Sequence, residues 1–405
     1  MHPAVSIGLV SMCTAWNLAG FVAIRRATTR AHLPPSAPPP PVSVLKPLNG
    51  AEAGLAANLR TFFTQDHPSF ELVFGVTDAL DPALAVVAQL RAEFPNVSCQ
   101  LAVHEGGAAL NPKVRNLLGM LPHATHDLVL ISDSNVRAPA HYVSELAQLH
   151  VAHRAGIVTN LFAGTDEATL GAALENVQLN GFCAAGSALP TLSGDAAIIG
   201  KSTLFSRAAL DRLGGLTRLS CVLAEDFILG KMFERAGLPI VIAPTVLENP
   251  NRALTPRAAF ARHLRWAMLR WRLRPVAALL EPLTSPLLML PFAWSSFGAA
   301  SLAWFAAVLA LRDLGGWVLL RGWRRAWLPV LLGPVRELAA PFAWLVGAFK
   351  RHVTWRGQRL RLSSGTLLYA EPRRHADQPK RAVRSAGMRG ARMPNTSRSS
   401  VRRTT

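Results

Sequence analysis

The sequence predicts an α/β domain with a mainly parallel sheet, flanked by membrane helices at both ends of the chain. Short apolar strands alternate with amphipathic helices from Val42 to about Val246. An apolar stretch of membrane-spanning length precedes them, and apolar stretches rich in tryptophan follow them. Half of the 405 residues are hydrophobic and 17% are charged, whereas soluble domains average about 25% charged. This balance favours a membrane-associated protein.

The first apolar stretch runs from Val5 to Ile24, which is long enough to cross a bilayer. No basic cluster precedes it, and three arginines follow it closely. The positive-inside rule therefore predicts an uncleaved transmembrane anchor at residues 1–25, with its carboxyl end in the cytoplasm. Residues 26–41 are basic and rich in proline, which favours an extended, semi-rigid linker.

Residues 42–250 form the predicted α/β domain. Apolar runs typical of buried parallel strands are Val42–Leu45, Glu71–Val76 and Leu128–Ser132, and helical stretches between them include Pro82–Phe94 and Pro139–Ala152. Strand–helix alternation of this kind gathers the carboxyl ends of the strands at one edge of the sheet. Ligands bind beyond that edge.

The character of the chain changes after residue 250. Residues 251–275 mix arginines with Phe, Leu, Met and Trp, which predicts an amphipathic helix lying on the membrane surface. Residues 276–362 are predicted to form a C-terminal membrane region of two to three passes or re-entrant helices, because prolines and charges interrupt its apolar stretches. Nine of the ten tryptophans lie at or after Trp266.

Residues 363–405 are predicted to be a disordered basic tail. From residue 371 onward there are ten Lys or Arg and two Asp or Glu, with few large apolar residues. Such a tail is either a solvated extension or a polybasic segment lying on anionic lipid. Since no aromatic residues interleave with its arginines, we expect no nucleic-acid binding.

Acidic residues fall where the predicted strands end. Asp78 and Asp81 follow the second strand, Asp133 follows the third, and Asp226 precedes a helix. Carboxylates at this edge can contact a ribose, hold a divalent cation or deprotonate an attacking hydroxyl. Each also has an ordinary role: Asp81 as a helix cap, Asp133 in a turn, and Asp226 as favourable charge at a helix start.

Basic residues complete the candidate site. On a helix, Arg262 and Arg265 share a face and Trp266 lies beside them. Two guanidinium groups suit a diphosphate, although they also suit lipid phosphates along an interfacial helix. Lys113 is a candidate donor contact or loop-positioning residue.

Several other kinds of site are excluded by their missing signatures. The chain has no Walker loop, no dinucleotide-binding glycine motif and no nucleophile elbow. Its four cysteines are far apart and none forms a CxxC pair, which argues against a disulfide framework or a zinc site.

The order of the motifs resembles the ceramide glucosyltransferase family, glycosyltransferase family 21. The matching segments are Ser43–Leu48, Asp78–Pro82, Asn111–Lys113, Asp133–Asn135, Ala224–Asp226, Arg262–Trp266 and Trp355–Leu362. Any one of these motifs is a weak signal, but the ordered set is specific. The stretch Gly181–Ser187 lacks a histidine that animal members carry, which leaves the sugar and the acceptor open.

The resemblance implies a GT-A-type nucleotide-sugar-binding domain on the cytoplasmic face and an inverting transfer from a UDP-sugar. It implies that Asp78 and Asp81 lie on the donor side and that Asp226 is the general base. It assigns Asp133, with Asn135, to a Mg²⁺ or Mn²⁺ ion and the diphosphate. Lys113, Arg262, Arg265 and Trp266 are then expected to bind the donor.

The expected reaction transfers glucose to a hydroxyl of ceramide, a membrane lipid. Bacterial relatives that add N-acetylglucosamine to hopanoids share most of these motifs, so that reaction is an alternative. A processive polysaccharide synthase and a non-enzymatic membrane scaffold are further alternatives. The expected partners are a UDP-sugar, a lipid acceptor and the membrane, and the expected location is a bacterial inner membrane.

Overall fold

A computed structural model describes residues 2–29, 38–193, 198–323, 327–355 and 358–370. The predicted linker at residues 26–41 lies in part outside these residues. The predicted tail lies outside them from residue 371 onward.

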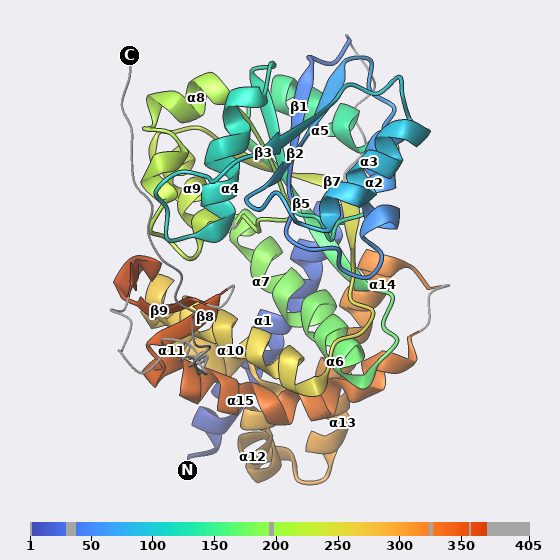
Figure 1. The fold of residues 1–405 in the computed structure, drawn as a ribbon. Helices are drawn as coiled ribbons and strands as arrows, with labels where there is room; N and C mark the ends of the chain where they lie inside the picture. Colours follow the sequence, from blue (N-terminus) through green and yellow to red (C-terminus); the bar gives the residue numbers. More distant parts are fainter. Residues whose placement is uncertain (1, 30–37, 194–197, 324–326, 356–357, 371–405) are drawn as a thin grey trace, which may run out of the picture. The chain divides into compact units, whose positions relative to one another are not determined.

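A seven-stranded sheet organises the domain, with strand order β3-β2-β1-β4-β6-β5-β7 (Figure 1). The strands are β1 (Val42–Pro47), β2 (Phe70–Val76), β3 (Cys99–Val103), β4 (Leu128–Ser132), β5 (Ile157–Thr165), β6 (Ser202–Ser206) and β7 (Ile240–Pro250). Strands β1, β2, β3 and β4 are parallel where they pair with one another, and β5 is parallel to β7. Only β6 is antiparallel, to β4 on one side and to β5 on the other. The predicted α/β fold with a mainly parallel sheet is confirmed.

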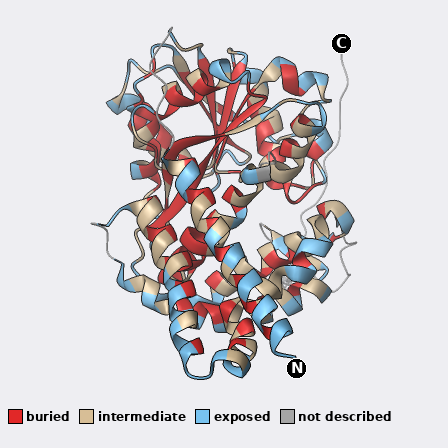
Figure 2. Ribbon diagram, turned by 180° about the vertical axis from the view of Figure 1, so that it is seen from behind, coloured by how far each residue is buried: buried red, intermediate tan, exposed pale blue. Residues whose placement is uncertain are grey.

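Helices cover both faces of this sheet. One face packs on α2 (Leu55–Phe63), α3 (Ala83–Glu93) and α5 (Tyr142–Ala152), and the other packs on α4 (Pro112–Met120), α8 (Arg207–Arg212) and α9 (Glu225–Arg235). Because both faces are covered, the central strands are apolar throughout rather than alternating. Figure 2 shows this burial along the strands, and every residue of β1 is buried.

The carboxyl ends of β1, β2 and β4 lie at the same edge, because these strands are parallel. The antiparallel β6 has its amino end there, with Ser202 paired to Ser132 at the end of β4. The residues that precede β6, Gly200 and Lys201, therefore reach the edge where sequence analysis expects the ligand.

Three described helices are long and apolar enough to cross a membrane: Pro3–Thr28, Ala300–Arg321 and Leu328–Phe349. A fourth candidate is the pair Pro275–Thr284 and Pro286–Phe297, which is bent by 50°. The predicted N-terminal membrane helix and two to three C-terminal passes agree with these candidates. The first helix, α1, continues to Thr28, three residues beyond the predicted end of the anchor.

The C-terminal candidate membrane spans consist of several consecutive shorter helices. They are α11 (Pro275–Leu280), α12 (Pro286–Phe297), α13 (Ala300–Leu309), α14 (Gly315–Arg321) and α15 (Gly333–Phe349). A π-helical turn, Ala310–Leu314, joins α13 to α14.

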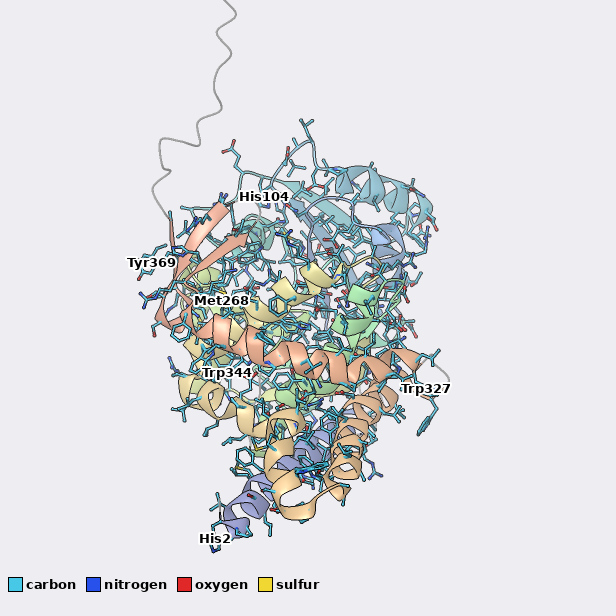
Figure 3. The ribbon with its side chains drawn as sticks, turned by 90° about the horizontal axis from the view of Figure 1, so that it is seen from below. His2, His104, Met268, Trp327, Trp344 and Tyr369 are labelled. Carbon is cyan, nitrogen blue, oxygen red and sulfur yellow. The ribbon has the colours of Figure 1, made fainter. Side chains whose placement is uncertain are left out.

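Helix α10 (Pro256–Leu273) packs directly against α15. The backbones come close at Gly347, where an added Cβ would lie 2.9 Å from Cβ of Ala267. The indole Nε1 of Trp271 donates to the carbonyl oxygen of Trp344 at 2.9 Å. Figure 3 marks the two helices by Met268 and Trp344. The domain and the C-terminal helices thus meet along α10.

The structure differs from the predicted C-terminal boundaries. Two segments expected in the membrane region form β8 (His352–Trp355) and β9 (Gln358–Leu362). They join β10 (Leu368–Ala370), which falls in the predicted tail, in a three-stranded antiparallel sheet. The reason is a period-2 pattern in β9: Leu360 and Leu362 are buried while Arg361 between them is exposed.

Candidate active site

Lys113 lies at the start of α4, at the ligand edge of the sheet. The side chain of Asn111 caps this helix by accepting from the backbone N–H of Lys113 at 2.9 Å and of Val114 at 3.1 Å. Pro112 occupies the first turn, where its missing N–H costs nothing. The local sequence therefore fixes the point from which the lysine side chain leaves the helix.

The ammonium group of Lys113 has three acceptors. Its Nζ lies 2.8 Å from Oδ1 of Asp133 and 3.3 Å from Oε1 of Glu225. It also donates to the carbonyl oxygen of Gly200 at 3.0 Å. Burial lowers the pKa of Lys113, but the charges of Asp133 and Glu225 outweigh burial and raise this pKa above its usual value. Lys113 thus joins the end of β4, the start of α9 and the segment before β6.

Asp133 directly follows β4 and is surrounded by lysines. Its Oδ1 contacts Lys113, and its Oδ2 lies 3.3 Å from Nζ of Lys201. Behind it, the fully buried Lys46 donates to its backbone oxygen at 2.6 Å. Burial raises the pKa of Asp133, but Lys113 and Lys201 outweigh burial and hold it well below its usual value. The carboxylate is therefore ionised and fixed in position.

Asp226 lies in the first turn of α9, where a negative charge is favoured by the helix dipole. Its Oδ2 accepts from the backbone N–H of Gly200 at 2.7 Å, and its Oδ1 accepts from that of Phe227 at 2.7 Å. An added Cβ on Gly200 would lie 2.8 Å from Nζ of Lys113 and 3.1 Å from Oδ2 of Asp226. The lack of a side chain at Gly200 thus lets the chain pass this close to the carboxylate.

Glu225 neighbours Asp226 and faces the interior of the cluster. Its Oε2 accepts from Nδ2 of Asn111 at 3.1 Å, in addition to its contact with Lys113. Burial raises the pKa of Glu225, and the nearby negative charge of Asp226 raises it further. The charge of Lys113 lowers this pKa but does not outweigh the other two effects. Both oxygens of Glu225 are thus held by protein partners, Lys113 and Asn111.

The two arginines of α10 differ in their contacts. Arg262 donates to Oδ1 of Asn251 at 3.2 Å and lies 3.5 Å from Oε1 of the buried Glu175. Within the described part of the chain, Arg265 has neither a hydrogen bond nor an ion pair. Burial lowers the pKa of Arg265, and the charge of Arg262 lowers it further, while Glu175 and Glu225 raise it. Arg265 is therefore a half-buried cation that the fold leaves available.

Three further candidates, on α10 and at the sheet edge, have structural contacts. Trp266 packs against the hydrophobic core on the α2 and α3 side of the sheet. Asp81 accepts from the backbone N–H of Gly50 at 2.9 Å and of Ala83 at 2.8 Å, which ties the loop after β1 to the start of α3. The exposed Asp78 accepts from the N–H of Leu80 at 2.9 Å. The two aspartates lie past the end of β2, and their hydrogen bonds within the described residues go to this loop region and not to the lysines around Asp133.

The residues assigned to a metal ion, Asp133 and Asn135, share one partner. Nζ of Lys201 donates to Oδ1 of Asn135 at 2.7 Å and pairs with Oδ2 of Asp133 at 3.3 Å. Among the described residues, no group of three or more His, Cys, Asp or Glu is arranged to hold a metal. Because the ammonium group of Lys201 contacts both of these oxygens, the arrangement does not fit a divalent cation bound by Asp133 and Asn135.

The sequence predicts Lys113, Asp133 and Asp226 as site residues but does not indicate three of their partners, which are Lys46, Gly200 and Lys201. It also does not indicate Glu175, the partner of Arg262. Lys46 lies in a strand that reads as core, and Glu175 lies in the amphipathic α6 (Leu170–Gln178). For Gly200 and Lys201 the available signal is a glycine a few residues before the apolar pair Leu204 and Phe205.

Comparison with known proteins shows the family to which the chain belongs. The family model described as glycosyl transferase family 21 matches residues 4–368. Ceramide glucosyltransferase 1 of Caenorhabditis elegans is 27% identical over 364 residues, covering 86% of this chain and 77% of the relative. Ceramide glucosyltransferase 3 of the same organism is 25% identical over 346 residues, covering 80% and 73%.

Among solved structures, a mannosyltransferase from Pyrobaculum calidifontis in complex with GDP-Man and Mn²⁺ is similar. It has a TM-score of 0.49 and 18% identity, and the match covers 85% of this chain and 99% of that one.

Proposed function

Because the chain belongs to glycosyl transferase family 21, we propose that this membrane-associated glycosyltransferase moves glucose from UDP-glucose to a hydroxyl of ceramide. The two nematode relatives, named as ceramide glucosyltransferases, support this sugar and this lipid. The arginines at the carboxyl end of α1, Arg25 and Arg26, support an orientation with the catalytic domain on the cytoplasmic side. We assign the protein to a bacterial inner membrane.

One observation supports this reaction most strongly: the first turn of α9 carries the carboxylate of Asp226, and α10 carries Arg265, which has no hydrogen bond or ion pair among the described residues. Asp226 is oriented by two backbone N–H groups at 2.7 Å. The charge of Glu225, the residue beside Asp226, acts on Arg265. A carboxylate such as Asp226 can take a proton from an attacking hydroxyl. A cation without a protein partner, such as Arg265, can stabilise negative charge that develops on a leaving group.

The proposed step is a single displacement. The acceptor oxygen attacks the anomeric carbon of glucose and transfers its proton to Asp226. The bond from that carbon to the diphosphate oxygen breaks, and its electron pair leaves with UDP. Because attack and departure take place on opposite faces of the sugar, the configuration at the anomeric carbon inverts. Asp78 and Asp81, at the neighbouring strand end, are proposed to contact the uridine half of the donor, and Trp266 to support the position of α10.

The contact between α10 and α15 supports a lipid acceptor. Helix α10 carries Arg262 and Arg265, and it packs on α15 through Gly347 and the hydrogen bond between Trp271 and Trp344. The helix whose arginines are proposed to bind the diphosphate, α10, thus packs against α15, which is part of a candidate membrane span. A hydroxyl near the membrane surface can reach such a site without leaving the bilayer.

The test uses the full chain reconstituted in lipid nanodiscs. We expect radiolabelled UDP-glucose and ceramide to give one labelled lipid whose mass corresponds to ceramide plus a single hexose with a β linkage. UDP-N-acetylglucosamine with a hopanoid forms a parallel arm. A product only in that arm would replace the proposed donor and acceptor, a labelled polymer would favour a processive synthase, and no product in either arm would refute the proposed transfer.

A further inference from the structure

We propose that Lys201 is a binding residue for the diphosphate of the donor and that it takes the place of a divalent cation between Asp133 and Asn135. This inference rests on the proposed function, because it requires a nucleoside diphosphate sugar as the donor. It concerns a residue that none of the sequence motifs includes.

The first argument is position. Nζ of Lys201 lies 3.3 Å from Oδ2 of Asp133 and 2.7 Å from Oδ1 of Asn135. These two oxygens are the ones that sequence analysis assigns to a metal ion. A divalent cation between these oxygens would neutralise the diphosphate of the donor. The ammonium group of Lys201 already contacts both oxygens and also carries a positive charge.

The second argument is the number of donors. An ammonium group has three N–H bonds to donate. Lys113 has three acceptors, on Asp133, Glu225 and Gly200. Within the described residues Lys201 has two acceptors, so one N–H remains for a ligand. Of the two lysines that hold Asp133, Lys201 is therefore the one able to bind a phosphate oxygen without losing a protein contact.

The third argument is rigidity. Lys201 directly precedes β6, where Ser202 is paired with Ser132, and its backbone N–H donates to Ile199 at 2.7 Å. Its side chain is only 15% exposed, whereas that of its partner Asp133 is 26% exposed. A cation buried to this extent is costly unless it is paired, and its pairing fixes its position. The ammonium group is thus already oriented before a donor arrives.

Lys201 and Arg265 can then act from two sides. Arg265 has no hydrogen bond or ion pair within the described part of the chain, and Lys201 retains one free N–H. When the bond between the sugar and the diphosphate breaks, the leaving oxygen gains the electron pair and the negative charge on UDP grows. Cations near that oxygen, of which Lys201 is held in place by Asp133 and Asn135, stabilise the charge as it develops.

The test measures binding of UDP and of UMP by calorimetry, with the full chain in nanodiscs, in EDTA and in MgCl₂. For the unchanged protein we expect the same UDP affinity in both solutions to within about threefold. Lys201→Met should weaken UDP binding in EDTA by about 10- to 100-fold, as expected for a lost hydrogen bond to a charged group. UMP binding should change much less, and Lys201→Arg should retain most of the UDP affinity.

The matched control is Lys350→Met, which removes an exposed lysine at the end of α15. It should bind UDP like the unchanged protein. The thermal midpoint of each variant separates a lost contact from a lost fold, and Lys201→Arg serves where Lys201→Met does not fold.

Two results would overturn the proposal. One is UDP binding that requires Mg²⁺, and the other is UDP binding in EDTA that Lys201→Met leaves unchanged. If transfer to lipid continues in either case, the proposed function stands without this role for Lys201. If UDP binds under neither condition, the proposed function itself fails.

Discussion

Among the described residues, one cluster of paired charges lies at the sheet edge and another lies among the candidate membrane helices. The second, called here the membrane ion cluster, consists of Arg312, Asp313, Arg336 and Glu337. Arg312 pairs with Asp313 at 2.7 Å and with Glu337 at 3.0 Å. Arg336 pairs with the same two acids at 3.3 Å and 2.9 Å. Two arginines and two acids balance in charge, and their side chains are at most 5% exposed.

The sheet-edge cluster is organised differently. Asp133 keeps 26% of its side chain exposed, and Arg265 has no ion pair among the described residues. In the membrane ion cluster every charged side chain has an oppositely charged partner, and the chain packs tightly around Asp313: a Cβ on Gly181 or Gly333 would lie 2.6 or 2.7 Å from an oxygen of Asp313. The comparison teaches that burial and pairing alone do not mark a reacting site. A cluster that can act on a ligand keeps a charge whose pairing is incomplete.

The largest expected effect is on turnover, from Asp226→Asn. Loss of a general base lowers rates by about 10²- to 10⁴-fold, so kcat for lipid glucosylation should fall by that factor while UDP binding and the thermal midpoint stay nearly unchanged. Single-turnover rates and calorimetry measure the two properties. Asp211→Asn, at an exposed residue of α8, is the control. Turnover that persists in Asp226→Asn would remove Asp226 as the base.

The membrane ion cluster predicts the opposite kind of change. Arg336→Met leaves Asp313 and Glu337 with one cation between them, and breaking a buried ion pair costs about 3–5 kcal/mol of stability. We expect a large fall in the thermal midpoint measured in detergent, with kcat per folded molecule close to that of the unchanged protein. Arg351→Met, at an exposed residue just after α15, is the control. Unchanged stability with a lower kcat would place this cluster in the chemistry.

A smaller effect is expected from Arg265→Met, which tests whether the unpaired arginine of α10 stabilises the leaving diphosphate. Because its guanidinium has no protein partner within the described residues, its removal should cost little stability. We expect kcat to fall by about 10- to 100-fold, as for loss of a charged hydrogen bond in the transition state. Arg265→Lys should recover part of that loss. An equal fall in Arg257→Met, at an exposed residue on the first turn of α10, would instead indicate a general effect of charge near the membrane.

The sequence predicted the parts of this picture that depend on local patterns. Apolar runs identified β1, β2 and β4, and the parallel arrangement of these strands placed Asp133 at the ligand edge, whereas the role of Asp226 was expected from the order of the motifs. It did not reveal β6, because an antiparallel strand inserted between β4 and β5 is paired by the tertiary fold and has no local signature. Lys201 reaches the site only through that strand, so the sequence could not show that it holds Asp133 and Asn135.

The membrane ion cluster was equally hidden. Arg312 and Asp313 are consecutive, and an ordinary helix would direct them differently. They lie in the π-helical turn Ala310–Leu314, where the extra residue changes the direction of both side chains. From the sequence, Arg336 and Glu337 appeared only as interruptions of an apolar stretch. Charges that pair between two helical segments, Ala310–Leu314 and α15, cannot be matched without the fold.

The smallest expected effect concerns a paired carboxylate at the opposite edge of the sheet. Oε1 of Glu71 accepts from the backbone N–H of Thr125 at 2.6 Å and from its hydroxyl at 2.8 Å, and also from Ser43. Burial raises the pKa of Glu71, but these hydrogen bonds outweigh burial and bring it below 4.5. A carboxylate with a lowered folded-state pKa contributes stability above its unfolded pKa, and that stability is lost as the pH falls through the folded value.

Glu71→Gln should therefore lower the thermal midpoint by about 2–4 °C at pH 7, and the difference should narrow as the pH falls below about 4. Turnover should not change, since Glu71 lies at the amino end of β2 and the reacting cluster lies at the carboxyl edge. Thermal unfolding between pH 3 and pH 7 measures the difference, with Glu52→Gln, at an exposed residue, as control. A difference that stays constant with pH would mean that the neutral hydrogen bonds, rather than the charge of Glu71, hold this end of the sheet together.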